Sequence, residues 1–215
     1  MFMKNDRSLN LATTLQANGA AVPAWLGGGA WVDAPNTLWW VTPDQRGRRV
    51  GPYGFDLAKL RRILRDEYGV MRFTFVMGYK QGAERARLRE AVLTAGWRYW
   101  EARKANFGWN ADPTDDYLLD ALVRELDRDV PGTIVLVAHD HGYGWILRHA
   151  LELGWRVVVI GCIDKMSGQL TGLSHPHYEV LDLRDMGVLP RSYAEVMRPM
   201  ASEPSRKPTP GSLPA

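Results

Sequence analysis

The stretch TIVLVAHDHGYGWILRHALELGWRVVVIG, residues 133–161, decides the fold class of this chain. It opens with the apolar run TIVLVA and closes with the apolar run RVVVIG, and neither run alternates with polar residues as a strand with a solvated face would. Between them, GWILRHALELG carries apolar residues at helical spacing. Two apolar strands joined through a helix predict a parallel sheet that is covered by helices on both faces.

The same alternation of strand and helix runs through most of the chain. Helices are predicted in residues 55–69, 84–96, 115–126 and 144–154. Strands are predicted in residues 30–33, 70–78, 97–103, 133–138, 156–161 and 178–183. The first helix has Leu57, Leu60 and Leu64 on one face, and Gly69 is its expected stop. The order predicts an α/β fold, a three-layer sandwich with a mainly parallel central sheet.

Length and composition indicate one domain with extensions. With 215 residues, the chain is divided by composition into an N-terminal extension (1–28) that we expect to be partly flexible, a domain (29–198) and a C-terminal tail (199–215). The tail is rich in Pro, Ser and Gly and has almost no large apolar residue, so we expect it to be disordered.

Charge and cysteine content limit the classes of partner and compartment. The chain has 27 Lys and Arg against 24 Asp and Glu, a net charge of +3 that permits a phosphate-rich partner without requiring one. The single cysteine, Cys162, excludes an internal disulfide framework and a Cys-rich zinc module. No apolar run has the length of a membrane span, and the N-terminus lacks a signal-peptide core. We therefore expect a soluble, cytoplasmic protein without membrane contact.

Several acidic residues follow the predicted strands closely. Asp33 ends the first strand, Asp140 follows TIVLVA, and Asp115 and Asp116 begin a helix on the same side if the connections are right-handed. Ligands of open α/β sheets bind beyond the carboxyl ends of the strands. An Asp at such a place is also a common helix cap or turn residue. Three acids converging on one edge favour a Mg²⁺ or Mn²⁺ site and metal-assisted phosphoryl transfer.

Three segments together resemble the NYN domains, a nuclease-like group in the PIN-like superfamily. WVDAPN (31–36) resembles the opening strand of that family, in which Asn follows the strand-ending Asp by three residues. AHDHGYGWILRHALELGWRVVVIG (138–161) is similar to the second signature, normally a Ser-Gly-Asp-Ser-Asp-Phe turn followed by a helix, a Gly and a strand. DDYLLDAL (115–122) stands where the family has an Asp-led helix, and SGQLTGLSHPHYEVLDL (167–183) is similar to its closing segment.

The resemblance implies a metal-dependent endoribonuclease that cleaves RNA with Mg²⁺ or Mn²⁺. It implies Asp33, Asp116 and Asp140 as metal ligands, with Asp115 as the alternative to Asp116, and it implies supporting roles for Asn36, Asp120 and His141. We favour Asp116 because the four-residue spacing places it on one helical face with Asp120.

Departures from the family pattern leave other functions open. Gly142 stands where the second Asp of the turn is expected, and no Lys-Gly turn precedes Asp115. A catalytically weak or inactive NYN-like domain that binds RNA or a protein partner is the main alternative. A phosphatase or DNA nuclease on the same scaffold is a third.

Aromatic and basic residues suggest where nucleic acid would bind. Trp39 and Trp40 follow Asp33, and Arg46, Arg48 and Arg49 come close behind; Lys80 follows the second predicted strand. Stacking and phosphate contacts of this kind suit single-stranded RNA, but a hairpin or a protein interface fits the aromatic pair equally well. A homodimer is left open.

Two His-x-His pairs raise the question of zinc. They are His139 with His141 and His175 with His177. Hydrolases with such a motif need further His and Asp ligands, and only His149 remains, so zinc is disfavoured.

Overall fold

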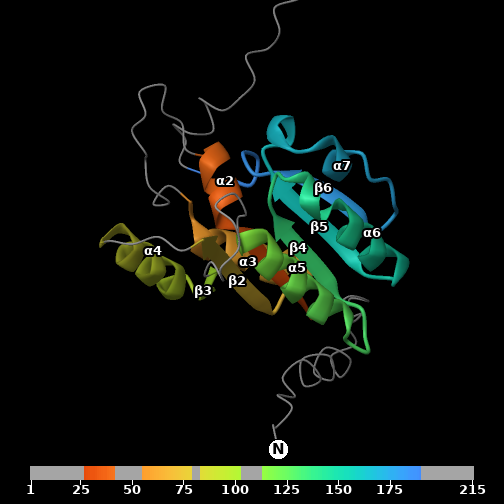
Figure 1. The fold of residues 1–215 in the computed structure, drawn as a ribbon, viewed down its shortest axis with the longest axis horizontal. Coiled ribbons are helices and arrows are strands. Elements are labelled where there is room, and N and C mark those ends of the chain that lie inside the picture. Colours follow the sequence, from red (N-terminus) through yellow and green to blue (C-terminus); the bar gives the residue numbers. More distant parts are fainter. Residues whose placement is uncertain (1–26, 42–54, 79–82, 103–112, 190–215) are drawn as a thin grey trace, which may run out of the picture.

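The central sheet contains six parallel strands. The computed structural model describes residues 27–41, 55–78, 83–102 and 113–189 (Figure 1). The strands are β1 (Gly28–Asp33), β2 (Arg72–Gly78), β3 (Arg98–Ala102), β4 (Thr133–Val137), β5 (Arg156–Gly161) and β6 (Tyr178–Asp182). They follow the spatial order β3-β2-β1-β4-β5-β6, and every neighbouring pair is parallel. The predicted α/β class and central sheet are confirmed. The predicted extension and tail lie largely or wholly outside the described residues.

Helices cover both faces of this sheet, which makes three layers (Figure 1). They are α2 (Ala34–Val41), α3 (Leu57–Tyr68), α4 (Ala83–Thr94), α5 (Pro113–Leu126), α6 (Gly144–Glu152) and α7 (Gly168–Thr171), with the short 3₁₀ helices η2 (His141–Tyr143) and η3 (Ile163–Lys165). One apolar core joins α3 and α4 to the sheet, and the other joins α5, α6 and α7 to its opposite face. No helix in the described ranges combines the length and apolar character needed to cross a membrane.

Local sequence explains the bounds of α3. Leu57, Leu60 and Leu64 are buried on one side of the helix, as their spacing predicts. The Asp56 carboxylate accepts a hydrogen bond from the Lys59 backbone N–H at 2.8 Å and caps the first turn. Gly69 ends the helix in the left-handed region, with φ of 67°, where a residue without Cβ is favoured. The predicted stop at Gly69 is confirmed.

The strand order reverses between β1 and β4, and this position locates the site. The chain leaves β1 toward β2 on one side and leaves β4 toward β5 on the other, so the carboxyl ends of β1 and β4 lie side by side where ligands of open α/β sheets commonly bind. Val32 is in register with Val137, which places Asp33 next to the residues that follow β4. The Thr37 hydroxyl donates to the Val137 carbonyl at 2.9 Å and fixes α2 against this end of β4.

Candidate functional site

Asp33 is the buried centre of the site. It ends β1 and is 1% exposed. Its Oδ1 accepts a hydrogen bond from the Asn36 backbone N–H at 3.2 Å, so it caps α2, and its Oδ2 lies 2.8 Å from the Tyr143 hydroxyl. A buried carboxylate is costly unless hydrogen bonds or charges stabilise it. Asp33 therefore has a structural role at the helix start and a second oxygen directed at another side chain.

Tyr143 joins two carboxylates from different elements. Its hydroxyl lies 2.8 Å from Asp33 Oδ2 and 2.9 Å from Asp115 Oδ1, and the residue is 1% exposed. Burial, then the charges of the two carboxylates, then the hydrogen bonds to them raise the pKa of Tyr143, so the hydroxyl keeps its proton. A hydroxyl has one proton and donates to one carboxylate at a time. We call Asp33 and Asp115 the tyrosine-bridged pair.

The acid of α5 that contacts Tyr143 is Asp115, whereas the sequence favoured Asp116; which of the two would bind a metal stays a prediction. Asp115 is half-buried and contacts Tyr143, whereas Asp116 is exposed. Successive residues of a helix point about 100° apart, which turns Asp116 away when Asp115 faces the site. Asp116 and Asp120 do share a helical face, but both are exposed, and Asp120 pairs with Arg124 at 2.8 Å. The structure does not bring Asp116 or Asp120 to the tyrosine-bridged pair.

Asp140 and His141 lie at the same edge, in the turn after β4. Asp140 Oδ1 accepts from the Gly142 backbone N–H at 3.4 Å and lies 2.7 Å from His141 Nδ1. The Asp140 side chain is 34% exposed and that of His141 is 73% exposed. The described contacts of Asp140 are with its own turn, which follows β4, the strand next to β1.

Asn36 and His139 connect β1 to β5. Asn36 Oδ1 accepts from the His139 backbone N–H at 2.9 Å and lies 3.2 Å from His139 Nδ1. His139 Nε2 accepts from the Cys162 backbone N–H at 2.8 Å, which assigns the ring proton to Nδ1. Burial lowers the pKa of His139 to about 4, against the raising effect of Asp164 and Asp182. Asn36 thus supports Asp33 through its backbone, while its side chain holds a neutral His139.

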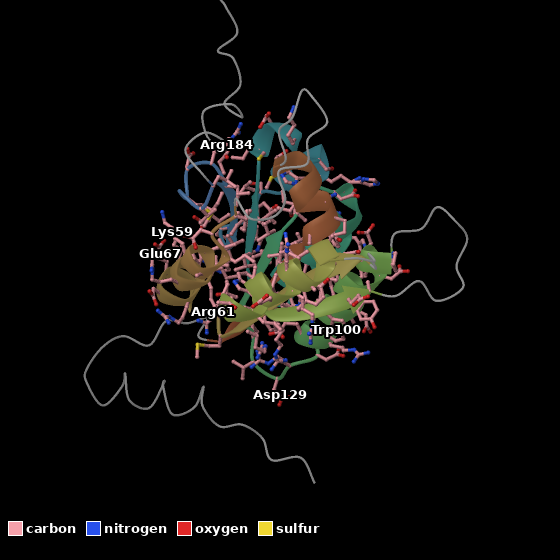
Figure 2. All side chains as sticks on the ribbon, turned by 90° about the vertical axis from the view of Figure 1, so that its left-hand side faces the viewer. Lys59, Arg61, Glu67, Trp100, Asp129 and Arg184 are labelled. Atoms are coloured by element: carbon pink, nitrogen blue, oxygen red, sulfur yellow. The ribbon has the colours of Figure 1, made fainter. Side chains whose placement is uncertain are left out.

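A second group of acids lies farther along the same edge. Arg184 Nε lies 2.8 Å from Asp182 Oδ1, and Arg184 Nη2 contacts Asp182 Oδ2 and lies 2.9 Å from Asp164 Oδ1. The Arg184 side chain is 8% exposed. Figure 2 shows Arg184 at the end of the sheet opposite Asp129, which lies in the loop before β4. We call Asp164 and Asp182 the arginine-bridged pair.

The histidines do not form a joint zinc site. His139 and His141 follow β4 at the carboxyl edge, whereas His175 and His177 precede β6 at the amino edge. His175 Nδ1 accepts from the His177 backbone N–H at 3.2 Å. Across the described ranges, no group of three or more His, Cys, Asp and Glu side chains is arranged to hold a metal ion.

The residues predicted to contact nucleic acid are not described by the structure. Trp39 and Trp40 fall in α2, but their side chains lie outside the described part, as do Arg46, Arg48, Arg49 and Lys80. Trp145 was not among the predicted residues; it lies in the first turn of α6 and is 56% exposed.

Comparisons with known proteins bear on the fold. No protein-family model matches the chain, and no curated protein matches it by sequence. The crystal structure of a protein of unknown function from Vibrio parahaemolyticus RIMD 2210633 is similar, with a TM-score of 0.62 and 14% sequence identity. The match covers 79% of this chain and 99% of that one. At this identity the likeness supports the α/β architecture alone.

Proposed function

We propose that this chain is a metal-dependent ribonuclease that hydrolyses RNA phosphodiester bonds with Mg²⁺ or Mn²⁺. The observation that carries the proposal is the convergence of Asp33 and Asp115, from β1 and α5, within 2.9 Å of one oxygen atom. They meet at the carboxyl edge of the sheet, where the strand order reverses and where ligands of such folds bind. The resemblance of WVDAPN and AHDHGY to NYN motifs supplies the reaction and substrate class.

The side chains at this edge fit a hard divalent cation. Mg²⁺ is commonly held by one or two carboxylates, with water and substrate phosphate oxygens in its other positions. Asp33 and Asp115 would supply the two carboxylates, and Asp140, in the turn after β4, stays a proposed third ligand although the described residues do not group it with them. The bound cation would activate water and stabilise the negative charge that develops on the phosphodiester.

The surrounding residues hold this edge in place and supply a group for proton transfer. The Asn36 backbone N–H fixes Asp33 Oδ1, and the bonds of His139 to Asn36 and Cys162 tie β1 to β5. Asp140 contacts His141 Nδ1, which leaves Nε2 of this exposed ring to exchange a proton with a substrate oxygen or solvent.

The exposed face of α6 supports a single-stranded nucleic acid as substrate. Trp145 is 56% exposed there, and Arg148 and His149 are exposed on the same face. An aromatic ring beside an arginine suits stacked bases and phosphates. The exposed face of α5 instead carries Asp116, which repels a phosphate backbone, and the ion pair of Asp120 with Arg124. We propose that the strand crosses α6 rather than α5.

One alternative function has support of its own. Gly142 replaces an acid of the resembled motif, and a neutral hydroxyl lies where Asp33 and Asp115 converge. Both features favour an NYN-like domain that binds RNA without cleaving it.

A cleavage assay with a matched control separates these functions. Wild type, Asp33→Asn and Asp116→Asn are incubated with labelled single-stranded RNA or DNA in Mn²⁺, Mg²⁺ or EDTA. We expect RNA cleavage with either cation, none in EDTA, a loss of about 100-fold or more in Asp33→Asn, and nearly full activity in Asp116→Asn. Cleavage that persists in EDTA or in Asp33→Asn contradicts the mechanism. RNA binding without cleavage favours the alternative, and equal cleavage of DNA contradicts the substrate assignment.

A further inference from the structure

The hydroxyl of Tyr143 lies between the carboxylates of Asp33 and Asp115. It ends η2, directly before α6, and its ring is buried with apolar residues of α6 and α7. The hydroxyl is therefore fixed by the turn after β4, while its two acceptors come from β1 and α5. One side chain connects three elements of the sandwich through a single oxygen atom.

The bridging hydroxyl and a cation would use the same carboxylate oxygens. Asp33 Oδ2 and Asp115 Oδ1 face the hydroxyl at 2.8 and 2.9 Å. A Mg²⁺ ion requires its oxygen ligands at about 2.0–2.1 Å in near-octahedral geometry. A carboxylate oxygen that accepts a hydrogen bond from the Tyr143 hydroxyl is a weaker ligand for a cation. It becomes a better ligand when that hydrogen bond breaks.

We propose that the Tyr143 hydroxyl takes the place of the cation in the cation-free protein, bridging Asp33 and Asp115 until a divalent cation displaces it. The inference rests on the proposed function and adds a regulatory property to the same site. Binding of the cation exchanges a neutral bridge for a charged one, so the bridge raises the cation concentration at which the site fills. Tyr143 is a positioning residue in this account, because it acts through the two carboxylates.

The direct test compares Mn²⁺ affinity in two tyrosine variants. Mn²⁺ is titrated into wild type, Tyr143→Phe and Tyr178→Phe, and the free ion is followed by electron paramagnetic resonance. Tyr178 is the matched control, because its hydroxyl donates to the Leu170 carbonyl at 2.6 Å and not to Asp33 or Asp115. We expect Tyr143→Phe to bind Mn²⁺ about tenfold more tightly than wild type. In wild type the cation must break one charge-assisted hydrogen bond to a carboxylate, and the free energy of that bond corresponds to a factor of about ten in affinity. Tyr178→Phe should bind as wild type does.

Thermal unfolding supplies a readout that does not depend on activity. In EDTA, Tyr143→Phe should unfold at a lower temperature than wild type, and saturating Mn²⁺ should raise its midpoint by more than it raises that of wild type. Unchanged or weaker Mn²⁺ binding by Tyr143→Phe overturns the inference while the proposed cation site stands. Absence of Mn²⁺ binding by all three proteins overturns both.

The wild-type protein provides a second test should Tyr143→Phe fail to fold. Loss of a hydrogen bond to a carboxylate changes the near-ultraviolet absorption of a phenol, so Mg²⁺ should produce a tyrosine difference spectrum that saturates with binding. Mg²⁺ binding without such a spectrum overturns the inference.

Discussion

Two pairs of carboxylates lie at the carboxyl edge of one sheet, and different groups bridge them. Asp164 and Asp182 share the guanidinium of Arg184, and Asp33 and Asp115 share the hydroxyl of Tyr143. A guanidinium carries a full positive charge and a rigid set of donors, whereas a hydroxyl is neutral and has one proton.

We propose that the arginine-bridged pair has a structural role and the tyrosine-bridged pair a functional one. The arginine-bridged pair receives its positive charge from the chain itself, so its geometry should not depend on ions in solution. The hydroxyl that bridges Asp33 and Asp115 is neutral, and we propose that this pair responds to divalent cations. Acidic residues at a strand end therefore do not define a metal site until their shared partner is known.

The largest expected effect is the loss of Arg184. Arg184→Met leaves two acids, one of them nearly buried, without their guanidinium. Removing one partner of a buried ion pair costs about 3–5 kcal/mol in the free energy of unfolding. Urea denaturation in EDTA and in Mn²⁺ should give the same loss. A loss below about 1 kcal/mol, or recovery with Mn²⁺, would contradict the structural role of this pair.

The next largest effect is expected between the two pairs, at Asn36. Asn36→Ala removes the acceptor of the buried His139 backbone N–H, and an unsatisfied buried donor costs about 1–3 kcal/mol. Denaturation in EDTA measures the loss. Asn36→Asp keeps an acceptor oxygen and serves as the control, so an equal loss in both variants would show that the bond to His139 is not the cause.

Acid should weaken the arginine-bridged pair through Asp182. Burial raises the pKa of Asp182, but hydrogen bonds from the Arg184 side chain and backbone, together with the Arg184 charge, outweigh burial and hold the pKa of Asp182 below its ordinary value. As the pH falls, Asp182 is therefore protonated at a higher pH in the unfolded chain than in the folded protein. The stabilisation is present above about pH 4 and is lost as pH falls through the folded pKa, with a slope of at most about 1.4 kcal/mol per pH unit. Denaturation from pH 5 downward, at roughly half-unit steps, should show a flatter profile in Asp182→Asn, and equal slopes would contradict the assignment.

The smallest effect on stability is expected at Gly142. A Cβ built there meets no heavy atom within 4 Å, and the residue is exposed. Gly142→Asp should change the free energy of unfolding by less than about 0.5 kcal/mol, while its added carboxylate raises Mn²⁺ affinity several-fold. Isothermal titration against Gly142→Asn, which has the same shape without the charge, isolates the effect. Equal affinities of the two variants would place Gly142 outside the cation site.

Most of the fold could be predicted from local sequence, because apolar runs and glycine stops are local signals. The strand ends at Asp33 and near Asp140 were located for the same reason. Helix α2 was not predicted, since the short segment APNTLWWV begins directly at the strand end without an apolar stripe of helical period. The four-residue spacing correctly placed Asp116 and Asp120 on one face of α5. Spacing alone does not say which face of a helix points to the sheet.

The contacts that define the site could not be predicted from sequence. Tyr143 lies 110 residues from Asp33, and His139 lies 103 residues from Asn36. A tyrosine beside a buried strand is ordinarily part of the core, and the ring of Tyr143 does lie in the core. Only its hydroxyl distinguishes it, and the position of that atom follows from the packing of three elements.

The central claim is that the tyrosine-bridged pair binds a divalent cation, and two adjacent residues test it most directly. Isothermal titration of Mn²⁺ into wild type, Asp115→Asn and Asp116→Asn compares the same change at neighbouring positions of α5. The account predicts that wild type and Asp116→Asn bind one Mn²⁺ with similar affinity, and that Asp115→Asn binds at least about tenfold more weakly. Equal binding by Asp115→Asn, or loss of binding in Asp116→Asn alone, would contradict it.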